Sequence, residues 1–520
     1  MRKSYARAKL EPQARISYDL FEAQVEEMKA AKKWRLDSYP LNQMHGLQSA
    51  LPAFMIDAHG ISNAEEAKAY IERLNGYELA AGQIIQSLKD RAEKGIILPK
   101  YLIGKVKQDL QNITKGAPFD SGADSSPLLR DFSDKLEKTE MSESEKKAFQ
   151  ADVTTALLGG FKSGCQHMED YLVELEALAD NRAGVWKFPD GDAFYAYAVR
   201  QHTTTDLKPD EIHQKGLEEV ERIHGEMKKV MTAVSFDGSL KAFFEKMRVD
   251  KQFYLSNDSI GRKAYLDRVQ VTLDTMQARL PSMFSIFPKA ELVVKPVEAF
   301  RAKSAGKAFY GQPSPDGTVP GIYYVNLHDM NAMPTYMLEA LAFHEGIPGH
   351  HMQLALAQEM TDLPKFRRHA FFNSYIEGWG LYAESLAREM GFYQDPYDEF
   401  GCLSMELWRA CRLVVDTGIH SKRWTKEEAI EYLKANTPNP ASEIENAVNR
   451  YIVMPGQATS YTIGMLKIRE LRERAAKKLG EDFELAEFHD LVLGNGALPL
   501  NLLEGLVDDW IAQKMTYLSK

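Results

Sequence analysis

Two short segments of the chain concentrate side chains that bind metal ions. The first, residues 338–353, reads Leu-Glu-Ala-Leu-Ala-Phe-His-Glu-Gly-Ile-Pro-Gly-His-His-Met-Gln and contains His344, Glu345, His350 and His351. Only 13 of the 520 residues are histidines, so a chance cluster of three beside a glutamate is improbable. Imidazole nitrogens are common zinc ligands, and the segment therefore predicts a zinc site.

The spacing of these histidines departs from that of the common zinc-protease helix. There, two histidine ligands lie four residues apart on one face, and the glutamate after the first is the general base. Here Pro348 stands four residues after His344, where it removes a backbone donor and interrupts a regular helix. If the proline and the glycine after it form a bulge that absorbs two residues, His350 takes the place of the second histidine. In an unbroken helix His351 would return to the first face, but roughly 10 Å further along the axis. We therefore expect His344 and His350 as zinc ligands, His351 as the alternative, and Glu345 as the base.

The second segment, residues 372–384, is expected to supply the third ligand from another helix. It reads Phe-Asn-Ser-Tyr-Ile-Glu-Gly-Trp-Gly-Leu-Tyr-Ala-Glu, and its Glu377 and Glu384, seven residues apart, share a helix face. Gly378 and Gly380 are costly inside a helix, which indicates the close approach of another backbone or of a substrate. A solvated acidic face is the alternative, but unpaired carboxylates seldom lie among aromatic residues. We expect Glu377 as the ligand, and Glu384 as an alternative ligand or as a side chain that orients one.

The two segments closely resemble the bacterial domain-of-unknown-function 885 family, on His344–Gln353 and Tyr375–Glu384. Further segments agree with this resemblance over nearly the whole chain: Gln201–Thr205, Gly321–Asn326, Arg412–His420 and Pro455–Gly464. That family looks like a distant relative of the helical gluzincin metallopeptidases, such as thimet oligopeptidase, angiotensin-converting enzyme and the thermostable carboxypeptidases. In the oligopeptidase pattern the third ligand follows the second histidine by about the interval between His350 and Glu377, which favours His350.

The resemblance implies a zinc-dependent peptidase of the oligopeptidase or carboxypeptidase type. It also implies a large, mostly α-helical fold with a deep cleft, and such a cleft restricts the substrates to short peptides. Tyr461 resembles the tyrosine that stabilises the transition state in gluzincins, although from the residues alone a core tyrosine is an equal interpretation. Two alternatives stay open: a zinc hydrolase of a non-peptide amide or ester, and a metal-free binding protein whose site is spoiled by the proline.

Two further groups are candidates for substrate binding. Tyr323, Tyr324 and Asn326 lie on a short β-type run before the histidines, where an edge strand would pair with an extended peptide; ordinary sheet packing is the alternative. A second group follows a helical rhythm of three and four residues, and its arginines would grip a substrate carboxylate or form a buried ion network. The residues in this group are Arg409, Arg412, Asp416 and His420.

Helical patterns dominate the elements that must position these residues. Amphipathic spacing predicts helices over 13–35 and 209–233, and a capping residue followed by acids predicts a helix start at 62–66. The runs 291–297 and 321–326 are short and β-branched or aromatic, and predict a small sheet beside the metal-binding helix. We expect one catalytic domain over 1–520, with two subdomains flanking a cleft as the alternative, and an exposed Gly/Pro/Ser-rich loop over 115–128.

Composition excludes several classes of protein. Hydrophobic residues are 44% and charged residues 27%, which is typical of a globular chain. The net charge of −10 and the lack of a dense Lys/Arg block argue against nucleic acid as a partner. No apolar run approaches the ~18 residues of a membrane span, and the start of the sequence shows no signal peptide. The compartment stays open: cytoplasmic, or periplasmic or lipoprotein if an N-terminal signal has been trimmed.

Overall fold

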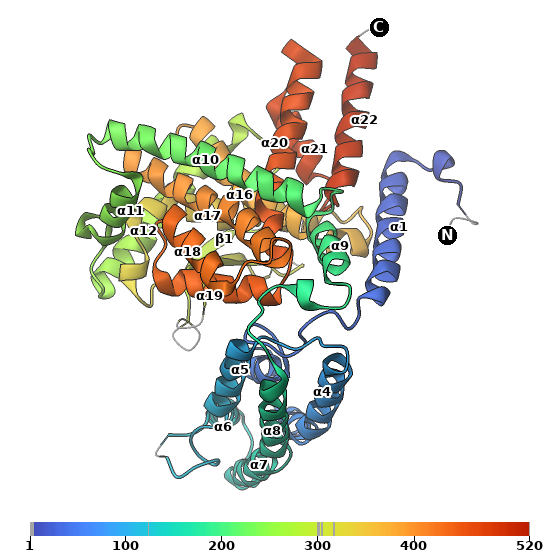
Figure 1. The fold of residues 1–520 in the computed structure, drawn as a ribbon, viewed down its shortest axis with the longest axis vertical. Coiled ribbons are helices and arrows are strands. Elements are labelled where there is room, and N and C mark those ends of the chain that lie inside the picture. Colours follow the sequence, from blue (N-terminus) through green and yellow to red (C-terminus); the bar gives the residue numbers. More distant parts are fainter. Residues whose placement is uncertain (1–4, 123, 299–301, 303–304, 316–317, 519–520) are drawn as a thin grey trace. The chain divides into compact units, whose positions relative to one another are not determined.

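The computed structural model of the chain describes residues 5–122, 124–298, 302, 305–315 and 318–518. The structure is 69% helical and has one small sheet of three strands among the described residues, so the predicted mostly α fold is confirmed (Figure 1). The chain divides into two compact units. Unit 1 comprises Met1–Ala31 with Tyr195–Lys520, and unit 2 comprises Lys32–Phe194.

Unit 2 is a bundle of helices. Their bounds are α2 (Leu47–Asp57), α3 (Ala64–Asn75), α4 (Tyr77–Ala92), α5 (Lys100–Ile113), α6 (Pro127–Glu137), α7 (Glu143–Ala156) and α8 (Lys162–Leu178). The predicted helix start near 62–66 is the beginning of α3, where the Asn63 side chain accepts a hydrogen bond from the backbone of Glu66. The predicted loop over 115–128 corresponds to the connection from α5 to α6, although its last two residues already belong to α6. Residue 123 of that loop lies outside the described residues.

Unit 1 carries every residue predicted to act in catalysis. Two helices cross the boundary in sequence between the units: α1 (Pro12–Lys33) ends in unit 2, and α9 (Gly191–Thr203) begins there. The other helices of unit 1 are α10 (Pro209–Ala233), α11 (Leu240–Val249), α12 (Ser259–Arg279), α13 (Leu338–Glu345), α14 (His350–Glu359), α15 (Lys365–Arg368), α16 (Asn373–Glu389), α17 (Pro396–His420), α18 (Lys426–Asn436), α19 (Ala441–Val453), α20 (Ser460–Leu479), α21 (Leu485–Leu493) and α22 (Leu500–Leu518).

Helix α17 is the central helix of unit 1, because it is buried from Phe400 to its last residue with few interruptions. The long helix α10, whose bounds match the prediction, packs along it (Figure 1). Gly216 of α10 makes this close packing possible, since a Cβ there would lie 2.8 Å from the Val414 side chain. The helices that carry the predicted ligands, α13 and α16, pack against each other and against α17.

The small sheet lies beside the metal-binding segment. Its strands are β1 (Leu292–Pro296), β2 (Ala308–Gly311) and β3 (Gly321–Val325), in the order β1-β3-β2, with β1 parallel and β2 antiparallel to β3. The prediction of β1 and β3 is confirmed. The prediction of β3 as an edge strand that pairs with a peptide is wrong, because β3 is the central strand and has a partner on both sides. Its backbone donors and acceptors are already used within the sheet.

Candidate metal centre

The metal-binding segment forms two helices instead of one. Helix α13 ends at Glu345, α14 begins at His350, and a four-residue connection between them contains Pro348. The indole nitrogen of Trp379 on α16 donates a 2.8 Å hydrogen bond to the carbonyl oxygen of Pro348. The predicted interruption at the proline is therefore confirmed, and α16 holds the connection in place.

The break brings three predicted ligands to one point. The Glu377 Oε2 atom lies 3.6 Å from Nε2 of His344 and 3.5 Å from Nε2 of His350. The three ligand atoms all lie within 4.8 Å of one another. In a tetrahedral zinc site with bonds of about 2.0–2.1 Å, two ligand atoms are about 3.4 Å apart. Two imidazoles and a carboxylate at these distances fit a zinc ion.

A second carboxylate orients His344 from the opposite side of its ring. Glu384, also on α16 and almost fully buried, lies with Oε1 2.7 Å from Nδ1 of His344. This contact leaves Nε2 of His344 free for a metal, which is the usual arrangement around metal-binding histidines. His350 differs, because its Nδ1 is buried without a hydrogen-bond partner among the described residues.

Electrostatics make this cluster attractive to a cation. Burial by itself would lower the pKa of His344, but Glu377, Glu384 and Glu345 outweigh burial and raise that pKa to about 9. Burial would likewise raise the pKa of Glu377, yet the two histidines hold it well below its usual value. The carboxylates thus stabilise a positive charge among these side chains, and a divalent ion supplies such a charge.

Two glycines of α16 allow the approach that the ligands need. A Cβ on Gly380 would lie 2.8 Å from Cε1 of His344, so only glycine lets the ring lie against the helix. A Cβ on Gly378 would lie 2.5 Å from the backbone of Gly464 on α20. The predicted approach of another backbone is confirmed at Gly378, which meets a second helix, whereas Gly380 meets the side chain of the predicted ligand His344.

Glu345, the predicted base, is the last residue of α13 and is nearly buried. Among the residues that the structure describes, none donates a hydrogen bond to its carboxylate. The pKa of Tyr323 on β3 is raised mainly by burial and also by Tyr265. The Glu345 carboxylate makes a further, smaller contribution to this rise, which indicates that Glu345 is near Tyr323. The Tyr323 hydroxyl is buried and has no hydrogen-bond partner among the described residues. Tyr323 is thus placed near the base, in the core of the sheet.

Tyr461 lies in the first turn of α20, beside Arg412 of α17. The guanidinium carbon of Arg412 lies 4.6 Å from the centre of the Tyr461 ring. Burial would lower the pKa of Arg412, but Tyr451, Tyr461 and the Glu377 carboxylate raise it. Arg412 therefore interacts electrostatically with the predicted ligand Glu377 and contacts the Tyr461 ring.

Four other candidates lie away from the three ligand atoms. His351, the alternative ligand, instead interacts with the Tyr310 hydroxyl at 3.0 Å and with the Ala290 carbonyl oxygen at 3.1 Å. Burial lowers its pKa to about 4. The assignment of His351 as a ligand is therefore corrected: the bend turns its ring toward the sheet.

The remaining three candidates have structural partners. The Tyr324 ring stacks on Phe309 of β2, and the Asn326 amide donates to backbone carbonyls that include those of Ala302 and Ala305. His420 is fully buried, and its Nε2 lies 3.0 Å from the Tyr451 carbonyl oxygen. Helical spacing predicts which residues share a face but not which neighbour that face meets, so it could not separate His420 from Arg412.

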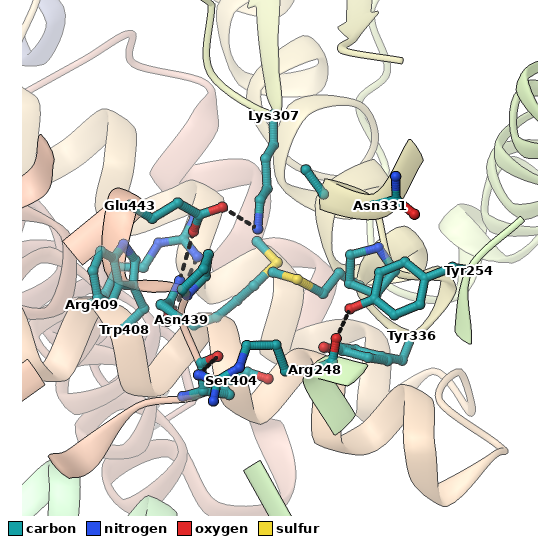
Figure 2. Close-up of a pocket in the computed structure, with 16 residues that line it drawn as sticks. Arg248, Tyr254, Lys307, Asn331, Tyr336, Ser404, Trp408, Arg409, Asn439 and Glu443 are labelled. Atoms are coloured by element: carbon teal, nitrogen blue, oxygen red, sulfur yellow. Dashed lines mark hydrogen bonds and ion pairs between the residues drawn. The ribbon is translucent and has the colours of Figure 1, made fainter. Parts of the chain in front are cut away.

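A pocket lies along α17, and its lining residues come from several segments of unit 1 (Figure 2). It has a volume of about 130 Å³, and Met337, Met405, Trp408 and Arg409 are among its lining residues. Arg409 connects it to the centre, because its Nη2 lies 3.7 Å from Oε1 of Glu384. Arg409 is predictable from the sequence, but the pocket is not, since its walls come from segments far apart in the chain.

The family described as "Bacterial protein of unknown function (DUF885)" matches residues 1–507. The chain belongs to this family. The bacterial domain-of-unknown-function assignment made from the two motifs is confirmed.

Two solved structures are similar to the chain. A crystal structure of a "putative lipoprotein" from Colwellia psychrerythraea is 35% identical, with a TM-score of 0.86 over 92% of this chain and 81% of that one. A "putative lipoprotein of unknown function" from Shewanella oneidensis shares the fold at 18% identity, with a TM-score of 0.74 over 97% of this chain and 89% of that one. No curated protein matches the chain. Among the described residues, no helix combines the length and apolar character that a membrane crossing requires.

Proposed function

We propose that this protein is a zinc-dependent hydrolase that cleaves peptide bonds in short peptides. The observation that supports this proposal is the convergence of His344, His350 and Glu377 on one point, with Glu345 directly after the first histidine. Two imidazoles and one carboxylate form a donor set of catalytic zinc sites, in which three protein ligands leave one position open. A structural zinc site would have a fourth protein ligand.

Each side chain has a role in this proposal. Zinc, when bound, lowers the pKa of a coordinated water and polarises the carbonyl group under attack. Glu345 accepts the proton of the attacking water and passes it to the leaving amine. Glu384 keeps the His344 ring oriented through Nδ1. The Tyr461 hydroxyl donates to the oxygen that becomes negative in the transition state.

The pocket along α17 supports a peptide as the substrate. It lies at Met337, directly before α13, and is connected to Glu384 through Arg409. We assign it to one substrate side chain, because its lining combines apolar residues with a few polar groups, as ligand pockets commonly do. A hydrolase of a non-peptide amide or ester would use the same ligands with a different occupant here.

Metal analysis combined with a substitution at the base tests the proposal. The purified protein should hold one zinc per chain and cleave members of a short-peptide library. Glu345→Gln should retain the zinc and lose cleavage by about 10²–10⁴-fold, the usual contribution of a general base. Glu473→Gln, at an exposed position of α20, is the matched control and should retain both.

Other results would favour the alternatives. Zinc with turnover of esters or non-peptide amides, and none of peptides, would identify the other type of hydrolase. Absence of bound metal after incubation with zinc, together with no turnover, would identify a binding protein.

A further inference from the structure

Arg412 is an arginine with buried donors and no acidic partner. Its Nε and Nη1 atoms are both buried and have no hydrogen-bond partner among the described residues. Neighbouring arginines are paired: Arg388 lies 2.9 Å from Glu399, and Arg469 lies 3.2 Å from Glu406. No carboxylate of the described residues lies within ion-pair distance of Arg412. Buried donors without acceptors are rare in folded proteins, which points to an acceptor that the chain itself does not supply.

The position of Arg412 limits what that acceptor is. Its guanidinium lies over the Tyr461 ring, 4.6 Å from the ring centre, and interacts electrostatically with the Tyr461 and Glu377 side chains. The buried Tyr451 hydroxyl interacts with the same guanidinium, and this interaction partly offsets the rise that burial causes in the pKa of that tyrosine. Trp408, one helical turn earlier on α17, lies 6.0 Å from the same guanidinium and lines the pocket. A ligand that reaches Arg412 is therefore close both to the centre and to the pocket.

We propose that Arg412 binds the C-terminal carboxylate of the substrate, so that the enzyme acts on peptides with a free carboxyl end and releases short C-terminal fragments. This inference rests on the proposed peptide hydrolysis. The planar guanidinium matches a carboxylate through two parallel hydrogen bonds, which a single peptide carbonyl cannot reproduce. The positive charge, uncompensated by an ion pair, selects an anion over a neutral group. The Tyr451 hydroxyl adds a further donor to the same carboxylate.

Paired peptides that differ only in a C-terminal carboxylate or a C-terminal amide test the proposal. Zinc-loaded wild-type protein should cleave the free acid with a kcat/KM roughly 100-fold above that of the amide, because one buried charge-assisted contact is lost. Arg412→Gln should bring this ratio close to one, mainly by slowing cleavage of the acid. Arg412→Lys should give an intermediate ratio, since lysine keeps the positive charge but cannot form two parallel hydrogen bonds with a carboxylate.

Arg130→Gln is the control, because Arg130 is exposed on α6 of unit 2 and donates to the Ser125 carbonyl oxygen. Its zinc affinity and its ratio of acid to amide should stay those of the wild type. Equal cleavage of acid and amide by the wild-type protein would overturn the role of Arg412 and leave the hydrolase intact. That comparison needs no variant, so it decides the matter even if the substitutions impair folding.

Binding measurements separate a failure of this inference from a failure of the proposed function. Calorimetry on zinc-loaded Glu345→Gln should show tighter binding of the free-acid peptide than of the amide, and Arg412→Gln in that background should abolish the difference. If no peptide is cleaved but the free acid binds more tightly, hydrolysis is refuted and carboxylate recognition stands. Equal binding of the two peptides refutes the recognition.

Discussion

His344 is the predicted ligand whose two ring nitrogens each lie near a carboxylate. One carboxylate, Glu377, lies at its Nε2, and another, Glu384, lies at its Nδ1. If zinc binds Nε2, the Nδ1–H would donate to Glu384, which would hold the ring in one orientation and make it a better donor to the metal. The orientation of this imidazole therefore depends on a carboxylate outside the proposed ligand set.

Substitution of Glu384 should weaken the metal site without removing a ligand. We expect Glu384→Gln to lower the zinc affinity by about 10–100-fold, the typical effect of losing such an outer partner. Competition with a chromophoric chelator measures the affinity. Glu389→Gln, on the same helix but paired with Arg472, is the control and should leave it unchanged. An unaltered affinity in Glu384→Gln would show that the carboxylate does not orient the ring.

Asp416 of α17 should make the stability of unit 1 depend on pH. Burial raises its pKa from 3.8 to about 7, even though the Tyr195 hydroxyl and the Gly456 amide donate to it. Between those values the folded carboxyl still holds a proton that the unfolded chain has lost. The contribution of Asp416 to the free energy of unfolding therefore falls as pH rises from about 4 to about 7.

Asp416→Asn removes this titration and keeps an oxygen as acceptor. Relative to the variant, the wild type should lose about 1.4 kcal/mol of unfolding free energy per pH unit across that window. Urea unfolding of both proteins at pH 5 and pH 7 measures the difference. Parallel pH dependences would contradict the prediction.

Residue identity alone predicted a ligand set but left one choice open. His344, His350 and Glu377 were singled out because histidine is scarce and the two glutamates share a helix face. The choice between His350 and His351 depended on how the connection at Pro348 bends, and the structure places only His350 beside the other two predicted ligands. Arg412 and His420 looked equivalent in the sequence, because helical spacing does not show which of them meets the core.

At the scale of elements, the crossing of α16 and α20 determines where Glu377 and Tyr461 lie. The two helices meet at Gly378 and Gly464, where either added Cβ would lie within 2.9 Å of the opposite backbone. Backbone atoms cannot yield as a flexible side chain can, so an added methyl group must push the helices apart. Glu377 precedes the crossing and Tyr461 lies one turn before it on the other helix.

Gly378→Ala should therefore destabilise unit 1 and weaken the metal site together. We expect a loss of about 1–3 kcal/mol of unfolding free energy, the usual cost of overpacking, with a lower zinc affinity because Glu377 moves. The matched control is Gly225→Ala on α10, where an added Cβ meets nothing within 4 Å. That variant should be about 0.5–1 kcal/mol more stable, since alanine favours a helix. Thermal unfolding and zinc titration of both variants check these outcomes.

Elements with strong local signals were predicted well, and those defined by long-range pairing were not. The proline and acids at the start of α10 and its apolar spacing gave both of its bounds. Strand β2 was missed because turn-forming residues follow it closely. The central place of β3 was missed as well, since strand order depends on pairing between distant segments and not on the strand's own residues.

At the scale of the whole molecule, the ligands and their supporting side chains all belong to unit 1. Zinc that binds only the folded form stabilises it by an amount that grows with concentration, about 4 kcal/mol at a thousand times Kd. Removal of zinc should therefore lower the unfolding temperature of unit 1 and leave that of unit 2 unchanged. Differential scanning calorimetry with and without a chelator measures this. Equal shifts of two resolved transitions would contradict it.

The break between α13 and α14 affects which ions the site accepts. In a continuous helix, the helical pitch sets the separation of two histidines and leaves little tolerance for ionic radius. Here that separation depends on the conformation of the connection at Pro348, whose carbonyl oxygen accepts a hydrogen bond from the Trp379 indole. A slight rotation of α14 would increase the distance between the two histidines and suit a larger ion such as Cd²⁺. We therefore expect the proposed site to discriminate among divalent ions partly through a tryptophan that would coordinate none of them.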